Sequence, residues 1–293
     1  MTGPIDRRLL LDWYEPRRGD FPWRAAPDPY RVLVAEFMLQ QTQVARVVPA
    51  HAAFLDRFPS VGALAAAAVG DVVRAWAGLG YNRRAVALRR AAQAVVERFG
   101  GRIPSDPADL VTLPGVGPYT AAAVASQAFG VPAAAVDTNV RRVVGRAVLG
   151  TSDAAPAAVA RAASDWLDPT DPGAWNQALM DLGREVCRPV PGCGSCPLRS
   201  PCAWAAHGTP APVPGARRAQ APPFEGSFRQ LRGRVVALLR DEAPIRLAEL
   251  AEALGEPVGR VALAVEALAA DGLILPDPAA CGGDPRGRVR LPV

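Results

Sequence analysis

Four of the chain's five cysteines lie within sixteen residues, and this spacing restricts the fold more than any other feature of the sequence. They are Cys187, Cys193, Cys196 and Cys202. In an intracellular protein such a cluster favours metal binding over disulfide bonds, because thiols stay reduced there. Iron–sulfur clusters commonly use a tight run of cysteines, whereas zinc sites more often use two separated CxxC pairs. We therefore rank an iron–sulfur cluster above zinc, and zinc above metal-free cysteines.

The pattern of apolar residues predicts an all-α body. Residues 31–48 have the composition of one largely buried helix, and helical patterns continue to about residue 99. No alternating strand pattern is convincing before residue 226. Further helices are expected at 138–149, 155–167 and 173–186.

A change of composition divides the chain into two predicted domains. Residues 208–226 are rich in Pro, Gly, Ala and Arg and are expected to link a body at 1–207 to a small module at 227–293. The module is expected to contain helices at Gln230–Leu239, Leu247–Leu254 and Val258–Asp271, and short strands around Ile274 and Val289. That order resembles a winged helix, and a plain helical appendage is the alternative.

The charge and the basic residues restrict the chemistry. The net charge of +5 is weak evidence for a polyanionic partner. All 33 basic residues are arginine, so no side-chain amine can form a Schiff base. No apolar run is long enough to span a bilayer, and the N-terminus has no signal-peptide core. We expect a soluble cytoplasmic protein without a membrane partner.

A glycine-rich turn is the first candidate binding site. A short helix is predicted to end at Leu113, the turn continues through Pro114, Gly115, Val116 and Gly117, and a second helix is predicted to begin near Pro118. Backbone N–H groups at such a helix start bind phosphate without reading the base sequence. The same five residues alone would be an ordinary turn.

Two carboxylates are candidates for catalysis. Glu36 lies inside the apolar run 32–39, where burial is expected to raise its pKa and to favour a general acid. The alternative is a core Glu paired with an arginine. Asp137 precedes a predicted helix, where it acts either as an ordinary N-cap or as a carboxylate beside the phosphate-binding turn.

Five stretches together resemble the MutY-type adenine DNA glycosylases, which belong to the helix-hairpin-helix superfamily and are related to endonuclease III. The resemblance covers roughly residues 5–205. It implies the helix-hairpin-helix glycosylase fold, with a [4Fe-4S] cluster on the loop 187–202. The family's cysteines are separated by six, two and five residues, whereas this chain has five, two and five. The stretches are EFMLQQTQVARVVP (36–49), GLGYNRRAVALRRAAQ (78–93), LPGVGPYTAAAVA (113–125), VDTNVRRV (136–143) and NQALMDLGREVC (176–187).

The resemblance also implies a role for individual residues. Glu36 matches the acid that protonates N7 of a flipped-out adenine, and Asp137 matches the carboxylate that stabilises the cationic sugar. Tyr119 and Asn139 match residues that hold these two groups. Three residues match positions that line the adenine pocket: Trp23, Arg24 and Gln177. The residues that wedge the duplex and contact the opposite base are matched by Leu39, Gln41, Thr42, Leu79 and Tyr81.

The implied function is a DNA repair glycosylase that hydrolyses the bond to adenine mispaired with 8-oxoguanine or guanine. Endonuclease III proteins carry a catalytic lysine where this chain has Tyr119, so little or no strand cleavage is expected. The implied partner is double-stranded DNA containing a mismatch or oxidised guanine, bound by a monomer in the nucleoid. A thymine or uracil mismatch glycosylase is the first alternative, and a non-catalytic iron–sulfur protein that binds DNA lesions is the second. Many relatives carry a C-terminal Nudix-like domain, for which residues 227–293 are too few and too helical.

Overall fold

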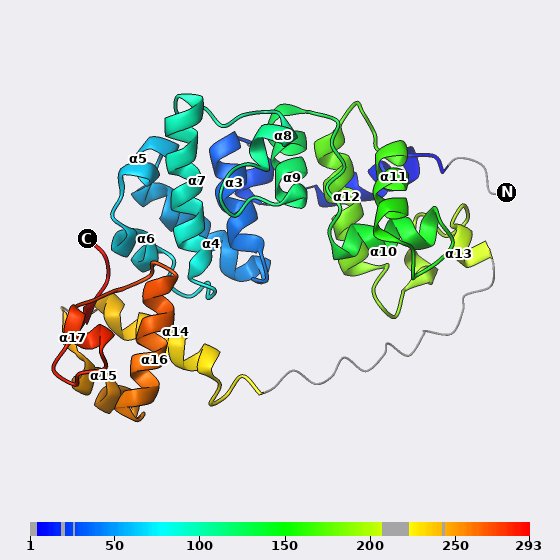
Figure 1. Ribbon diagram of the computed structural model, residues 1–293. Coiled ribbons are helices and arrows are strands. Elements are labelled where there is room, and N and C mark those ends of the chain that lie inside the picture. The colour runs from blue at the N-terminus through cyan, green and yellow to red at the C-terminus, as the bar shows by residue number, and fades with distance from the viewer. Residues whose placement is uncertain (1–4, 19–20, 26, 207–222, 242–243) are drawn as a thin grey trace. The chain divides into compact units, whose positions relative to one another are not determined.

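The computed structural model describes residues 5–18, 21–25, 27–206, 223–241 and 244–293 (Figure 1). The described elements up to residue 206 are all helices, and those after residue 226 are helices and three short strands. The elements in chain order are α1 (Arg8–Tyr14), η1 (Glu15–Arg17), α2 (Pro22–Ala25), α3 (Pro29–Leu39), α4 (Val44–Arg57), α5 (Val61–Ala66), α6 (Val69–Ala75), α7 (Arg83–Phe99), α8 (Pro107–Leu110), α9 (Pro118–Phe129), α10 (Thr138–Ala147), α11 (Pro156–Trp166), α12 (Pro172–Glu185), η2 (Cys193–Ser195), α13 (Ala203–Ala206), α14 (Phe228–Asp241), β1 (Ile245–Arg246), α15 (Leu247–Leu254), α16 (Val258–Ala270), β2 (Leu275–Pro276), α17 (Pro278–Cys281) and β3 (Arg288–Arg290).

The chain forms two compact units. The first contains Met1–Glu36, Ile103–Thr112 and Val116–Arg218, and the second contains Phe37–Arg102, Leu113–Gly115 and Ala219–Val293. Within the described residues, no helix is both long enough and apolar enough to cross a membrane. The predicted linker, 208–226, falls largely outside the described residues, and the predicted domain boundaries stay predictions.

The first unit is built around α12. Helices α1, α9 and α10 pack on α12, and α11 packs on α10. The start of α12 is fixed locally, since Asp171 accepts a hydrogen bond from the Ala174 amide and Pro172 occupies the first turn. The core includes Tyr14, Trp166 and Trp175, and the last two rings meet edge to face with centroids 5.1 Å apart. The helices predicted at 138–149, 155–167 and 173–186 are thereby confirmed within one or two residues.

The second unit contains α4–α7, where α7 packs on α5 and α6. The prediction of one helix over 31–48 was wrong, because α3 ends at Leu39 and α4 begins at Val44. Gln41 lies between them with a φ of 58°, in the left-handed region. The break is stabilised from outside, since the Arg84 guanidinium donates to the last-turn carbonyls of Phe37 and Met38 at 2.7 and 2.9 Å.

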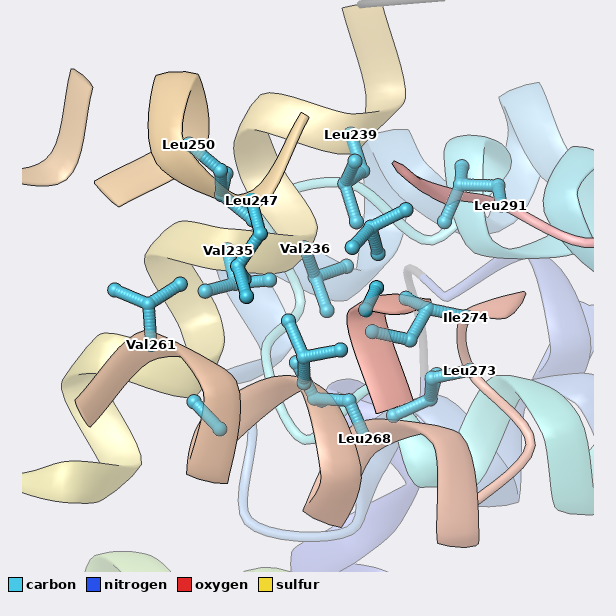
Figure 2. Close-up of a cluster of buried hydrophobic side chains, with 14 of the residues drawn as sticks. Val235, Val236, Leu239, Leu247, Leu250, Val261, Leu268, Leu273, Ile274 and Leu291 are labelled. Atoms are coloured by element: carbon cyan, nitrogen blue, oxygen red, sulfur yellow. The ribbon is translucent and has the colours of Figure 1, made fainter. Parts of the chain in front are cut away.

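The C-terminal residues of the second unit share a core with α6 and α7. Figure 2 shows apolar side chains of α14, α15 and α16 facing one another around Val236 and Ile274. Val73 and Val86 of the preceding helices belong to the same cluster. Burial of one such side chain stabilises a fold by about 1.5–3 kcal/mol, so this region and the helices before it are expected to unfold together.

Three strands complete this region. They form an antiparallel sheet in the order β1-β3-β2, with Ile245 opposite Val289 and Leu275 opposite Arg290. The three predicted helices and the strands near Ile274 and Val289 are confirmed. The strand β1 was not expected, because a pair of residues is too short to show a period. The likeness of the region to a winged helix stays a prediction.

Candidate active site

The carboxyl of Glu36 is buried in the last turns of α3. Its residue is 3% exposed and lies among Val34, Ala35 and Phe37, which are also buried. Loss of solvation raises the pKa of Glu36 from 4.5 to about 7. Hydrogen bonds from Tyr119 and Gln127 and the charge of Arg24 oppose this rise. Glu36 is therefore poised to be protonated near neutral pH, as a general acid requires.

Two side chains of α9 surround this carboxyl. The Tyr119 hydroxyl lies beside Glu36 and 3.1 Å from the Sδ atom of Met180, and burial raises the Tyr119 pKa. The Gln127 amide lies about two turns further along the helix, and its Nε2 and Oε1 atoms are buried without any other hydrogen-bond partner among the described residues. A buried amide beside Glu36 can bind either protonation state of the carboxyl, because an amide is both donor and acceptor.

The alternative for Glu36 was a core residue paired with an arginine, but the nearby Arg24 pairs with Asp181 instead. The Arg24 guanidinium donates to Asp181 on α12, with an N–O distance of 3.0 Å and with both side chains at most 10% exposed. Arg24 lowers the pKa of Glu36 only through its charge. The Glu36 carboxyl therefore keeps its raised pKa, because no ion pair holds it ionised.

Asp137 is held in a single orientation at the start of α10. Its Oδ1 atom accepts from the Val140 amide at 2.7 Å, which makes it the N-cap, and its Oδ2 atom accepts from the Asn139 amide at 2.9 Å. The N-cap prediction for Asp137 is confirmed. The charge of Asp137 contributes slightly to the raised pKa of Glu36. The two carboxyls are therefore close enough to interact electrostatically.

The Asp137 network continues to the cysteine loop. The Asn139 side-chain oxygen accepts from Arg142 at 2.9 Å, and Arg142 also donates to the carbonyls of Gly183 and Cys187. Gly183 allows this arrangement, since a Cβ atom there would lie 2.6 Å from the Asn139 Cβ atom. Every member belongs to the first unit.

The three residues predicted to line the adenine pocket lie in the same unit as Glu36. Trp23 is 2% exposed, and its ring stacks on Phe21 with a centroid separation of 5.3 Å. Gln177 is buried on α12, one residue from Asn176, whose side chain hydrogen-bonds the backbone of Ala133 and Ala135. Their predicted contacts with a base stay predictions.

The predicted phosphate-binding turn begins earlier than expected, because the helix before it was predicted to end at Leu113. The helix before it, α8, ends at Leu110, because the Thr112 amide donates to the carbonyl of Asp109, three residues back, in place of a further helical bond. Gly115 has a φ of 78°, and a Cβ atom there would lie 2.9 Å from Ala87 and Phe37. Gly117 is the exposed N-cap of α9, and a Cβ atom there would meet nothing within 4 Å. The first glycine is required by the fold, whereas the second leaves the helix N-terminus open.

The predicted wedge and opposite-base residues lie on two loops of the second unit. Gln41 and Tyr81 are exposed, and they are the non-glycine residues with a positive φ among those described, at 58° and 46°. Leu39 and Thr42 are half-buried, and Leu79 is buried at 4% exposure. Backbone strain of this kind concentrates at functional sites, where the surrounding structure maintains it.

One buried arginine connects the two loops. Besides the end of α3, Arg84 donates to the Thr42 hydroxyl at 2.9 Å and to the carbonyls of Leu79 and Gly80 at 3.1 Å each. Burial lowers the Arg84 pKa to about 10, which leaves the group charged at neutral pH. The run of arginines in this part of the sequence indicates either a DNA-facing surface or a solvated face, and neither interpretation places Arg84 inside the fold.

The four clustered cysteines line one small cavity together with Arg146 and Trp204. None forms a disulfide. Within the described ranges, no three His, Cys, Asp or Glu side chains are arranged to hold a single metal ion. Arg146 donates to the carbonyls of Arg188 and Pro189 at 2.7 and 3.1 Å, which ties the cysteine loop to α10. The four cysteines therefore border one shared cavity.

Comparison with known proteins identifies the family. Residues 34–169 match the HhH-GPD superfamily of base excision DNA repair proteins. An adenine DNA glycosylase of Mycolicibacterium smegmatis is 43% identical over 276 residues, which cover 90% of this chain and 91% of that protein. The chain belongs to the adenine DNA glycosylase family. It is thus a base-excision DNA repair enzyme.

Solved structures of the same superfamily resemble this adenine DNA glycosylase family member. A thermostable thymine-DNA glycosylase is 30% identical, with a TM-score of 0.65. The match covers 69% of this chain and 95% of the glycosylase chain. A trapped endonuclease III–DNA covalent intermediate is 25% identical, with a TM-score of 0.60 over 71% of this chain and 99% of its own. These likenesses confirm the predicted helix-hairpin-helix glycosylase fold.

Several residues of the site were not found from the sequence of this family member. Gln127, Met180 and Asp181 act through contacts between helices that lie far apart in the chain. A signal existed for Asp181, since an acidic residue in the buried stripe of α12 needs a cationic partner. Gln127 and Met180 carried no such signal, because both residue types occur in ordinary helices.

Proposed function

We propose that the protein removes adenine mispaired with 8-oxoguanine or guanine from double-stranded DNA by hydrolysis. One observation carries the proposal: Glu36 is a buried carboxyl with a pKa of about 7 in the same environment as the hydrogen-bonded carboxylate of Asp137. A pair of carboxyls with different protonation is what cleavage of an N-glycosidic bond requires.

The two carboxyls divide the reaction between them. Protonated Glu36 donates its proton to N7 of an extruded adenine, so the bond from N9 to the sugar C1′ breaks with its electron pair on the base. The sugar becomes an oxocarbenium ion, which the ionised Asp137 stabilises from its fixed position at the start of α10. Water then adds to C1′, and the proton that it loses passes to the Glu36 carboxylate, which restores the protonated acid for the next turnover. Tyr119 and Asn139 hold the acid and the carboxylate, respectively.

Adenine fits a protonated Glu36 better than thymine does, because thymine has no N7 to protonate. The Mycolicibacterium smegmatis relative is itself named an adenine DNA glycosylase. A second candidate substrate is thymine or uracil opposite guanine, which the likeness to a thymine-DNA glycosylase favours. The predicted adenine pocket of Trp23, Arg24 and Gln177 would decide between these bases.

The enzyme is proposed to be monofunctional. Strand cleavage by this superfamily needs an amine that attacks C1′ and forms a Schiff base. The chain has no lysine, and a tyrosine that faces Glu36 stands at the position of the endonuclease III lysine. The product is therefore an abasic site in an uncut strand, and we propose that a monomer makes it.

The cysteine loop is proposed to hold a [4Fe-4S] cluster through Cys187, Cys193, Cys196 and Cys202. The four cysteines line one small cavity, and a tight run of cysteines is the ligand set that such a cluster would take. Its role would be to fix the loop structurally. Analysis of iron and acid-labile sulfide in the purified protein tests this, with Cys196→Ser expected to lose both and Cys281→Ser, at the exposed fifth cysteine, to lose neither. A zinc content near one per chain would overturn the cluster.

An excision assay tests the substrate and the reaction together. Duplexes with adenine opposite 8-oxoguanine, adenine opposite guanine, and thymine or uracil opposite guanine are each followed with and without hot alkali. Release of adenine, with strand breaks only after alkali, supports the proposal. Release of thymine or uracil in its place would overturn the assigned substrate, and strand breaks without alkali would overturn the monofunctional mechanism.

Two variants connect the assay to the site. Glu36→Gln keeps the shape of the side chain but cannot donate a proton, so it should bind the duplex and release no base. Glu97→Gln, on the exposed part of α7, should excise at the wild-type rate. Near-normal excision by Glu36→Gln would remove Glu36 from the reaction.

A further inference from the structure

A groove in the second unit lies beside the predicted opposite-base contact. It has a volume of about 460 Å³, within the range of small-ligand sites. One wall is the loop that ends in Arg83, and the other is the start of α14 with the end of α16. Its main side chains are aromatic or cationic: Tyr81, Arg83, Phe224, Phe228, Arg229 and Arg232.

The aromatic side chains of the groove are unusually exposed. Phe224 is 52% exposed, Tyr81 48% and Phe228 41%. Exposed rings that gather in one place mark a binding surface, because a monomeric protein gains nothing from leaving them in water. Flat rings of this kind stack on nucleic-acid bases of any sequence.

The charge of the groove is positive. Arg83 is 71% exposed and lies 3.8 Å from Asp271, whose main ion pair is with Arg232. Arg229 has its guanidinium 4.9 Å from the centroid of the Phe224 ring. Three arginines and no acidic residue line the groove, and Asp271 pairs with only two of them, Arg83 and Arg232. Cationic charge therefore remains for a phosphate, and the planar guanidinium groups can also stack.

The groove is held to the loop that carries Tyr81. Arg240 of α14 donates to the Asn82 side chain at 2.9 Å and to the carbonyl of Val73 at 3.1 Å. Arg74 in turn donates to the carbonyl of Arg240 at 3.1 Å. These bonds join residues that are separated by more than a hundred and fifty positions in the sequence, and they fix both walls of the groove.

We propose that this groove binds an unpaired nucleotide of the DNA, with the base against the aromatic rings and the phosphate on the arginines. The inference rests on the proposed function only in taking DNA as the ligand. It assigns the C-terminal region a direct part in DNA binding through α14, rather than through its small sheet. The combination of stacking rings and guanidinium groups favours a nucleotide over a peptide or an apolar partner.

Binding by fluorescence anisotropy tests the groove with two labelled duplexes, one fully paired and one with a single unpaired nucleotide. The wild-type protein should bind the second duplex more tightly. Phe228→Ala and Phe224→Ala should each reduce affinity for the second duplex about tenfold, the usual range for one stacked base. Arg229→Gln should reduce the slope of log affinity against log salt by about one.

Leu263→Ala is the matched control, since Leu263 is 59% exposed on α16 and lies outside the groove. Thermal unfolding of every variant checks that the fold is retained, and Phe228→Leu separates loss of the ring from loss of apolar bulk. Wild-type affinity of both phenylalanine variants for both duplexes would overturn the inference. Excision plays no part in this measurement, so an enzyme that released no adenine would refute the proposed function and leave this test intact.

Discussion

At the scale of single residues, two carboxyls of the same chemical type are placed in opposite conditions. Glu36 lies among apolar side chains and has a raised pKa, with Tyr119 and Gln127 as its polar neighbours. Asp137 receives hydrogen bonds from the Val140 backbone amide and from the Asn139 side chain, which fix its orientation at the start of α10. The environment, rather than the residue type, thus assigns the acid and the carboxylate.

The first prediction concerns the pH dependence of excision. Because the acid must be protonated and the pKa of Glu36 is about 7, the single-turnover rate should be constant well below pH 7 and should fall about tenfold per unit well above it. Rates measured on DNA-saturated enzyme at a series of pH values check this. A rate that does not change across pH 7 would show that Glu36 is not the proton donor.

The same shift predicts how stability depends on pH. The folded pKa of Glu36, about 7, lies above its unfolded value of 4.5, so the folded state binds more protons between these values. Its stabilising contribution is complete below pH 4.5 and is lost as the pH rises through about 7. Denaturant unfolding should therefore show the wild type losing stability relative to Glu36→Gln over this window. If the stability of the two proteins changed with pH in parallel, the raised pKa of Glu36 would be contradicted.

At the scale of elements, the two glycines of the hairpin before α9 have different surroundings, and we predict a structural role for Gly115 and a binding role for Gly117. Gly115→Ala places a methyl group 2.9 Å from Phe37 at a positive φ, so it should destabilise the fold by about 1–2 kcal/mol or more. Gly117→Asp meets no steric obstacle, and Asp is a favoured N-cap that leaves stability unchanged.

The two substitutions, Gly115→Ala and Gly117→Asp, should affect DNA binding differently from stability. The carboxylate of Gly117→Asp would repel a phosphate at the N-terminus of α9 and weaken binding of any duplex. Thermal unfolding and duplex affinity, measured on both variants, distinguish the roles. Full duplex affinity of a stable Gly117→Asp protein would show that this helix N-terminus binds no phosphate.

Arg84 gives a second prediction at this scale. Arg84→Met keeps much of the apolar contact but leaves buried carbonyls of Phe37, Met38 and Leu79 without their donor. We expect a loss of about 3 kcal/mol in the free energy of unfolding. Hydrogen exchange should also quicken around Gln41 and Tyr81, whose loops it joins. Arg102→Met, at an exposed position, is the control and should change neither measurement.

Periodicity predicted the elements better than it predicted their ends. Helices α10, α11 and α12 carry strong apolar stripes and were located within two residues. The break after Leu39 was missed, because it depends on hydrogen bonds from Arg84, which comes more than forty residues later in the chain. A local pattern contains no information about such a partner.

Prediction of the candidate site had the same limit: local sequence patterns located residues but not their distant partners. Burial of Glu36 followed from its apolar neighbours, and the cap at Asp137 followed from the helix after it. The contacts around these two residues join distant segments: Gln127 of α9 lies beside Glu36, and Arg142 connects Asn139 to the carbonyls of Gly183 and Cys187. Family resemblance supplied roles for matched residues, but it could not supply contacts that only the folded chain creates.

At the scale of the whole molecule, Asp137, the proposed stabilising carboxylate, and the cysteine loop belong to one hydrogen-bonded network. Asp137 is bound by Asn139, Asn139 by Arg142, and Arg142 by the carbonyl of Cys187. Rigid support of this kind is needed because small displacements of a reacting group cost large factors in rate. The cysteine loop can therefore affect catalysis without touching the substrate.

The last prediction tests that connection with two adjacent arginines. Arg142→Met removes the donor that joins Asn139 to the cysteine loop, so it should slow excision about tenfold, as is usual for a residue that orients a reacting group. Arg141→Met is the control, since Arg141 is exposed and donates only to the carbonyl of Ala154 among the described contacts. Rates are compared at saturating enzyme and divided by iron content, because a positioning role slows the reaction while the iron is retained. Slowing in proportion to lost iron would show that Arg142 acts on the folding of the loop, and equal rates for the two variants would show that the loop and Asp137 are independent.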